Sequence, residues 1–162
     1  MTGAPAMPEQ LAVPALRLVL DTNTVMALWM FEDPALQPLR RLIDAAQPEL
    51  IARSDSLEEL RRVLAYRQFG ITAERQAEIL AAYAARTRII ARAADAAPAS
   101  PVPLPVCRDR DDQKFLEIAR DGGATHLVSR DKALLRLNRH RLVRPRFTIL
   151  TPEAFIAARL PH

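Results

Sequence analysis

Apolar residues recur along the chain with two different periods, and these predict strands and helices in alternation. Four short apolar runs are predicted to be strands: LVL (18–20), ELIARS (49–54), THLVSRD (125–131) and RFTIL (146–150). The first run has no polar alternation, which is typical of a strand buried on both faces. Between the runs, apolar residues return at helical spacing, as at Leu57, Leu60 and Leu64. This pattern predicts an α/β fold with a parallel sheet covered by helices on both faces.

The middle of the chain is predicted to contain two helices with an extended segment between them. Thr72 is expected to cap a helix that continues through Ile89, and a second helix is expected to run from about Asp112 to Gly122–Gly123. The segment between them, APASPVPLPVCRDRDD (97–112), contains four prolines. Because proline removes a backbone donor and disfavours helix before it, this segment is predicted to be extended.

The size and composition of the chain indicate one ordinary globular domain. Its 162 residues are 49% hydrophobic and 26% charged, and no run approaches the roughly 18 apolar residues of a membrane span. We therefore expect a flexible arm over residues 1–15, a single domain over 16–162, and a cytoplasmic protein without membrane contact. The lone Cys107 excludes a disulfide framework and a thiolate zinc site.

Acidic residues follow two of the predicted strands. Asp21 ends the run LVLD, and Asp131 ends the run HLVSRD. Because parallel strands present their carboxyl ends at one edge of a sheet, where open α/β sheets bind their ligands, these two side chains are expected to converge.

Two further acids lie at the starts of predicted helices, which flank the same edge. Glu59 precedes Val63 by one turn, and Asp112 precedes Phe115 and the rest of an inward apolar face. Four clustered carboxylates repel one another unless a cation neutralises them. Ligands made only of oxygen select a hard cation, Mg²⁺ or Mn²⁺, which retains water that is able to attack a phosphodiester.

Four segments of the chain resemble the PIN-domain ribonucleases, particularly the toxin components of bacterial toxin–antitoxin pairs. These segments are LDTN (20–23), EEL (58–60), CRDRDDQKFLEIA (107–119) and LVSRDKALL (127–135). The resemblance implies a three-layer α/β/α sandwich with a central, mainly parallel sheet of four to five strands. It further implies Mg²⁺- or Mn²⁺-dependent cleavage of single-stranded RNA by a metal-activated water, a cognate antitoxin as partner, and often a homodimer.

The family's functional positions are carried over residue by residue. Asp21, Glu59, Asp112 and Asp131 match the catalytic acids, with Asp21, Asp112 and Asp131 as the implied metal ligands. Asn23 and Ser129 match the polar positions beside these acids. The alternates in the same turns are Glu58, Asp109 and Asp111.

Each acid also has a simpler interpretation. Asp21 and Asp131 are suitable caps for the helices that follow them, and Asp112 suits the first turn of its own helix. Glu59 is placed to form a surface pair with Arg61 or Arg62. The joint placement of all four acids at one edge favours the site.

Two other functions remain as alternatives. A PIN fold without activity would serve as an interaction module, and a metal titration separates that case from a nuclease. A haloacid-dehalogenase-like phosphatase also begins with an acid after its first strand, but Asn23 stands where that chemistry needs a second aspartate. The four glycines form neither G-x-G-x-x-G nor a P-loop, which argues against a nucleotide-binding domain.

Basic residues are concentrated after the last of these acids. The net charge is +4, almost all of the cations are arginine, and several of them fall between positions 130 and 146. A solvated face is the simpler interpretation, and an RNA-backbone track is the functional one. The predicted RNA-binding residues are Arg130, Arg136, Arg139 and Arg141.

Overall fold

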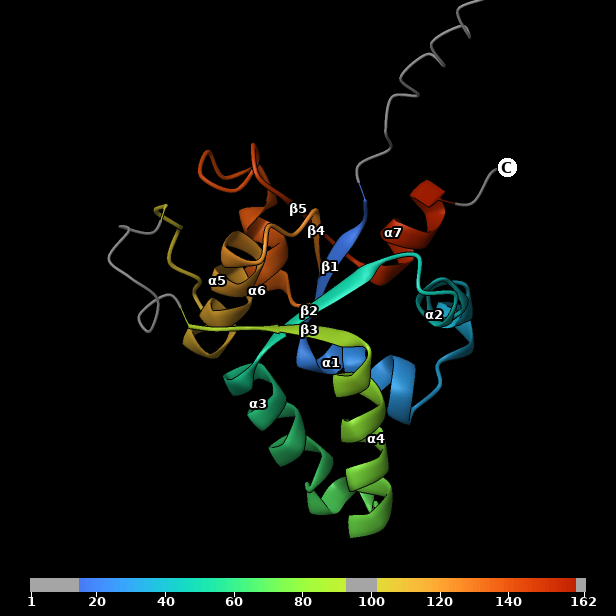
Figure 1. The fold of residues 1–162 in the computed structure, drawn as a ribbon. Helices are drawn as coiled ribbons and strands as arrows, with labels where there is room; N and C mark the ends of the chain where they lie inside the picture. The colour runs from blue at the N-terminus through green and yellow to red at the C-terminus, as the bar shows by residue number, and fades with distance from the viewer. Residues whose placement is uncertain (1–14, 93–101, 160–162) are drawn as a thin grey trace, which may run out of the picture.

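The structure is built on one parallel sheet. The computed structural model describes residues 15–92 and 102–159. Within them, five strands form the sheet: β1 (Arg17–Leu20), β2 (Glu49–Arg53), β3 (Thr87–Ile90), β4 (His126–Val128) and β5 (Thr148–Leu150). The strands lie in the order β3-β2-β1-β4-β5, and every neighbouring pair is parallel (Figure 1). The predicted α/β sandwich with a parallel sheet is confirmed.

Helices cover both faces of the sheet because the strand residues alternate between two apolar cores. Leu18 and Leu20 belong to one core, whereas Val19 between them belongs to the other. The first core is closed by α1 (Thr22–Val25) with the π-helical η1 (Met26–Met30), α2 (Gln37–Asp44), α3 (Ser54–Leu64), α4 (Ala73–Ala85) and α7 (Pro152–Arg159). The second core is closed by α5 (Gln113–Asp121) and α6 (Lys132–Leu135). The short 3-10 turns are η2 (Pro34–Leu36), η3 (Arg67–Phe69), η5 (Arg110–Asp112) and η6 (Arg136–Arg139).

The strand order places the chain reversal at the centre of the sheet. The chain moves outward from β1 to β3 and then returns to the other side of β1 as β4. Leu20 at the end of β1 is in register with Val128 at the end of β4, and the Asp21 amide donates to the Val128 carbonyl at 3.3 Å. Residues more than 100 positions apart are therefore side by side at the carboxyl edge, where such sheets bind ligands.

The predicted helix from Thr72 through Ile89 is too long. Helix α4 ends at Ala85, and the chain continues as β3, which pairs with β2 from Leu50↔Thr87 to Arg53↔Ile90. The Thr87 hydroxyl donates to the Ala84 carbonyl at 2.9 Å and helps to end the helix. Because β-branched residues suit a strand and β2 offers an open edge, pairing overrides the helical spacing.

Two predicted segments lie partly outside the described residues. The arm at 1–15 is described only at Ala15, and the crossing segment 97–112 is described from Val102 onward, where residues 102–107 have no regular secondary structure. No helix in the described part of the chain is long and apolar enough to cross a membrane.

Candidate metal centre

Asp21 joins the ends of β1 and β4. Its Oδ1 accepts hydrogen bonds from the Thr24 amide at 2.9 Å and the Thr24 hydroxyl at 2.6 Å, and its Oδ2 accepts one from the Ser129 hydroxyl. The residue is only 4% exposed, and burial raises the pKa of its carboxyl, although the bonds from Ser129 and Thr24 act in the opposite direction. Asp21 is therefore both the predicted cap of α1 and a buried link to the strand that carries Asp131.

Replacing Asp21 by alanine is expected to destabilise the fold. The change removes a helix cap and leaves the Thr24 amide without that acceptor, which together cost about 1–3 kcal/mol in free energy of unfolding. Urea denaturation measures the loss. Asn23→Ala is the matched control, because Asn23 is exposed on the same helix and its loss should stay within about 0.5 kcal/mol. Equal stability of the two variants would contradict the structural role of Asp21.

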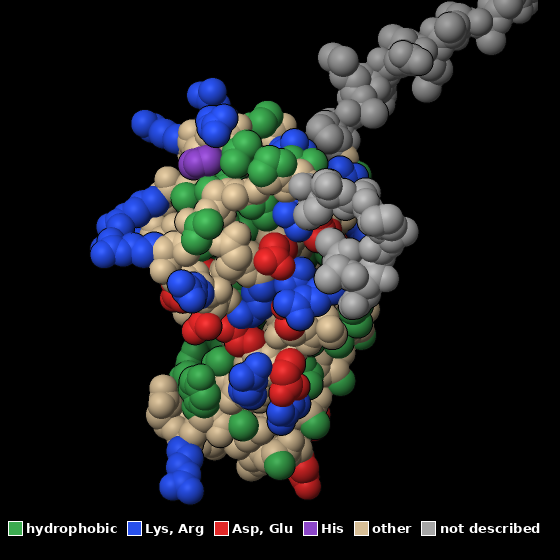
Figure 2. All heavy atoms as spheres, turned by 90° about the vertical axis from the view of Figure 1, so that its left-hand side faces the viewer, with side chains coloured by type: hydrophobic (Ala, Val, Ile, Leu, Met, Phe, Trp, Pro, Cys, Tyr) green, Lys and Arg blue, Asp and Glu red, His purple; other side chains and the backbone are tan. Residues whose placement is uncertain are grey.

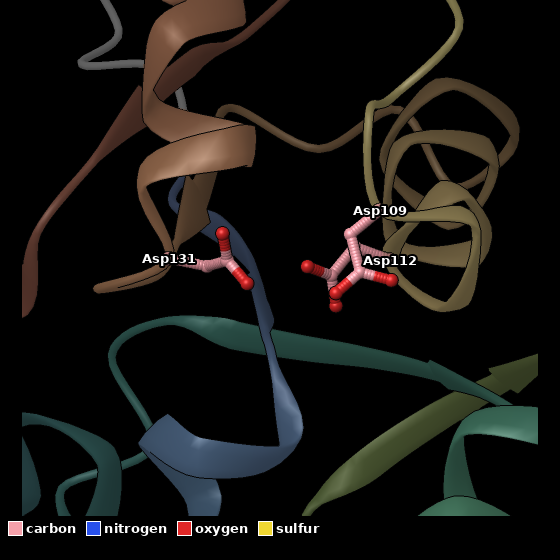
Figure 3. Close-up of side chains that lie close together, drawn as sticks. All are labelled: Asp109, Asp112 and Asp131. Carbon is pink, nitrogen blue, oxygen red and sulfur yellow. The ribbon is translucent and has the colours of Figure 1, made fainter.

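Three carboxylates converge opposite this link. One oxygen from each of Asp109, Asp112 and Asp131 lies within 4.8 Å of the other two. Asp109 and Asp112 come from the start and end of the η5 turn, and Asp131 faces them from the N-terminus of α6 (Figure 3). Asp131 also caps α6, since its Oδ1 accepts from the Ala133 amide at 2.7 Å. The structure thus brings Asp112 and Asp131 together with the alternate Asp109, while the oxygens of Asp21 are engaged by Thr24 and Ser129.

The ionised form of Asp112 is disfavoured in this cluster. Burial, together with the negative charges of Asp131, Asp109 and Asp21, raises the pKa of Asp112 to about 8. A proton on Asp112 is shared with Asp131, and this hydrogen bond lowers the pKa of Asp131. When both groups are ionised, the buried Oδ2 of Asp112 has no donor among the residues that the structure describes. A divalent cation with oxygen ligands would remove the repulsion and satisfy this oxygen, so the residues fit Mg²⁺ or Mn²⁺.

Glu59 extends from α3 toward Thr22, just after β1, and toward Lys114 at the start of α5. Its Oε2 accepts from the Thr22 hydroxyl at 2.6 Å and lies 3.4 Å from the Lys114 ammonium of α5. Glu58, by contrast, points to solvent, where its Oε2 accepts a hydrogen bond from Arg61 Nε at 2.9 Å. The surface pair considered for Glu59 therefore belongs to Glu58, and Glu59 is the acid directed toward the sheet edge.

Comparison with known families agrees with this geometry. A family model for the PIN domain matches residues 17–133, well over half of the chain. The chain belongs to the PIN-domain family. PIN domains are typically nucleases, so membership supports a nuclease, a hydrolase of phosphodiesters, in general terms. A search among curated proteins found no match.

The other predicted site residues of this PIN domain, Ser129, Asn23 and Asp111, differ in how deeply they are buried. Ser129 is buried and central, because its hydroxyl donates to Asp21 and accepts from the Asp131 amide at 2.9 Å. Asn23 is exposed on α1, and Asp111 is exposed in η5, where its amide donates to Asp109. Ser129 therefore positions both strand-end acids.

The arginines of the predicted RNA track divide into two groups. Arg130 forms ion pairs with Glu153 and, at 3.2 Å, with Asp33. It therefore ties α7 and the loop before η2 to the end of β4. The remaining members of the track are exposed on η6 and the turn after it: Arg136, Arg139 and Arg141. Their contact with RNA stays a prediction.

Lys114 is the residue that sequence reasoning missed. It stands in the first turn of α5, two positions after Asp112, and its side chain is only 17% exposed. Its ammonium bonds the Asp111 carbonyl as well as approaching Glu59. Its signal in the sequence is weak, because the segment CRDRDDQK (107–114) mixes basic and acidic residues.

Proposed function

We propose that this PIN domain is an endoribonuclease that cleaves single-stranded RNA with Mg²⁺ or Mn²⁺. The proposal is carried by one observation, the three carboxylates of Asp109, Asp112 and Asp131 within 4.8 Å at the edge where the chain reverses. Oxygen ligands alone suit a hard divalent cation. Family membership adds the reaction class, phosphodiester hydrolysis.

The side chains of the site have distinct proposed roles. Asp112 and Asp131 hold the cation, and Asp109 adds a third oxygen from the exposed side of the cluster. When bound, the cation lowers the pKa of water and offsets charge that builds on the phosphoryl oxygens. Glu59, oriented by Thr22 and Lys114, completes the cage or positions the attacking water. Asp21 contributes its charge and fixes Ser129.

The finer biological role is also a proposal. The similarity of the four segments to toxin components supports a ribonuclease toxin that a cognate antitoxin inhibits. Single-stranded RNA as substrate, a cytoplasmic site of action and a homodimer follow from the same resemblance. An interaction module without catalysis is the competing function, and the paired Asp112 and Asp131 argue against it because such a module has no need for a strained acid pair.

The ends of the RNA products test the proposed reaction. Water attacks phosphorus in line and breaks the bond to the 3′ oxygen, so the products are expected to carry 5′-phosphate and 3′-hydroxyl ends. The ribose 2′-hydroxyl takes no part, and a substrate with 2′-deoxy nucleotides at the cleaved position should be cut in the same way. End-group analysis by mass spectrometry measures both. Cyclic phosphate ends, or full cleavage in EDTA, would overturn the mechanism.

A further inference from the structure

A charged cleft of about 250 Å³ lies beside the acid cluster. It lies between α3 and the start of α5 and is lined by five cationic side chains: Arg53, Arg62, Arg92, Arg110 and Lys114. On the side of the molecule that carries these helices, Figure 2 shows Lys and Arg side chains gathered among Asp and Glu side chains. Because Arg110 and Lys114 flank Asp112 in sequence, the cleft and the acid cluster share one turn of the chain.

The wall of the cleft contains a buried arginine in a fixed ion network. Arg53 ends β2 and is 1% exposed, and its Nε and Nη2 each lie 2.7 Å from an oxygen of Asp55. Its Nη2 also contacts Glu117 at 3.1 Å. The guanidinium keeps the pKa of the Asp55 carboxyl below its ordinary range. This network commits Asp55 and Glu117 to Arg53. Of the outer arginines, Arg62 also lies 3.8 Å from a carboxylate oxygen of Glu58.

The outer cations make the cleft suitable for an anion. Arg62, Arg92 and Arg110 are all exposed, and with them the five cations of the cleft outnumber its three acids. Residues at the N-termini of α3 and α5, the positive ends of the two helix dipoles, both border the cleft. A polyanion drawn toward three carboxylates needs an adjacent positive surface, and this cleft is directly adjacent.

We propose that the cleft holds a backbone phosphate of single-stranded RNA next to the bond that is cut. Arg62, Arg92 and Arg110 contact phosphate oxygens, and Lys114 lies between the phosphate and Glu59. The inference rests on the proposed function and names the residues that hold its substrate. It places the RNA track on α3, η5 and α5, whereas the sequence pattern placed it on residues 130–146.

Two neighbouring arginines on α3 offer a matched test. Both arginines contact Glu58, Arg61 at 2.5 Å and Arg62 at 3.8 Å, but Arg62 lines the cleft, whereas Arg61 lines the groove between α3 and α4. Their side chains are similarly exposed, at 66% and 58%. The proposal therefore predicts different effects for two substitutions that change the net charge equally.

Binding is measured in EDTA, so that cleavage does not interfere. Fluorescence anisotropy of a fluorescein-labelled oligouridine of twelve nucleotides gives the affinity between 50 and 200 mM salt. Each lost phosphate contact should weaken binding about eightfold at 50 mM salt and reduce the salt slope by about 0.7. We expect R62Q to lose one such contact and R62Q/R110Q to lose two, whereas R61Q, which changes the net charge as much as R62Q does, should stay within about twofold of the wild type.

The outcomes separate the cleft from the reaction. Equal losses in R61Q and R62Q, or a loss confined to R136Q/R139Q, would overturn the proposal. An RNA affinity that no cleft variant changes would also overturn it and leave an acidic protein partner as the occupant. RNA that binds through the cleft but is never cut with Mn²⁺ would refute the proposed function while supporting the cleft. Metal-dependent cleavage by a protein whose RNA affinity does not change in the cleft variants would support the proposed function and refute the role of the cleft.

Discussion

Replacing Asp112 by asparagine is expected to reduce metal-dependent RNA cleavage by about 10³-fold, a loss of about 4 kcal/mol in transition-state stabilisation. Asparagine keeps the size of the side chain but removes the charge that holds the cation. Cleavage rates are measured with Mn²⁺ on single-stranded RNA. Asp121→Asn is the control, because Asp121 stands at the other end of α5, pairs with Arg120 and should leave the rate unchanged.

Without metal, the same variant is expected to lose no stability. Burial and the negative charges of Asp131, Asp109 and Asp21 disfavour ionised Asp112, so the folded wild type must retain a proton on it up to about pH 8, and an asparagine avoids that cost. Asp112→Asn in EDTA should therefore unfold at the same urea concentration as the wild type or a higher one. A variant that loses both activity and stability would show that Asp112 is a structural residue.

Mn²⁺ is expected to stabilise the wild type increasingly as the pH rises from 5.5 to 8.5. The ion binds only the native cluster with Asp112 ionised, and at one hundred times the dissociation constant it adds about 2.7 kcal/mol. For a domain of this size that is a rise of about 5–10 °C in Tm. Thermal unfolding with and without Mn²⁺ measures it, and Asp112→Asn should show little or no shift.

Without metal, the pH dependence has the opposite sign. Asp112 titrates near 8 in the native state and near its ordinary value in the unfolded chain. Between these values the native state retains a proton that the unfolded state has lost, so stability falls as the pH rises. His126, whose pKa burial lowers, acts in the opposite direction at mildly acidic pH, as it contributes stability that is lost on acidification. The His126 contribution is common to both proteins, so it cancels when the free energy of unfolding of Asp112→Asn is subtracted from that of the wild type. A difference that does not change with pH would contradict the raised pKa of Asp112.

The sequence by itself determined the local elements and the edge of the sheet at which the acids gather. The apolar runs predicted four of the five strands, and the uninterrupted run Leu18–Leu20 correctly indicated burial on both faces. Asp21 and Asp131 were predicted to lie at one edge because each follows a strand, and parallel strands present their carboxyl ends at the same edge of a sheet. These inferences succeed since side-chain period and strand polarity are properties of the local chain.

Only the tertiary structure decided which charged groups meet. Glu58 and Glu59 are neighbours with the same side chain. Only Glu59 contacts the Thr22 hydroxyl and the Lys114 ammonium, which belong to residues 37 and 55 positions away in the sequence. The approach of Asp109 to Asp131, and the burial of Arg53 between Asp55 and Glu117, likewise depend on how α5 packs against the sheet. Strand β3 formed because β2 offered an open edge, although its residues continued a helical pattern. Local periodicity cannot determine such contacts, because their energies depend on partners that the fold brings together from distant parts of the chain.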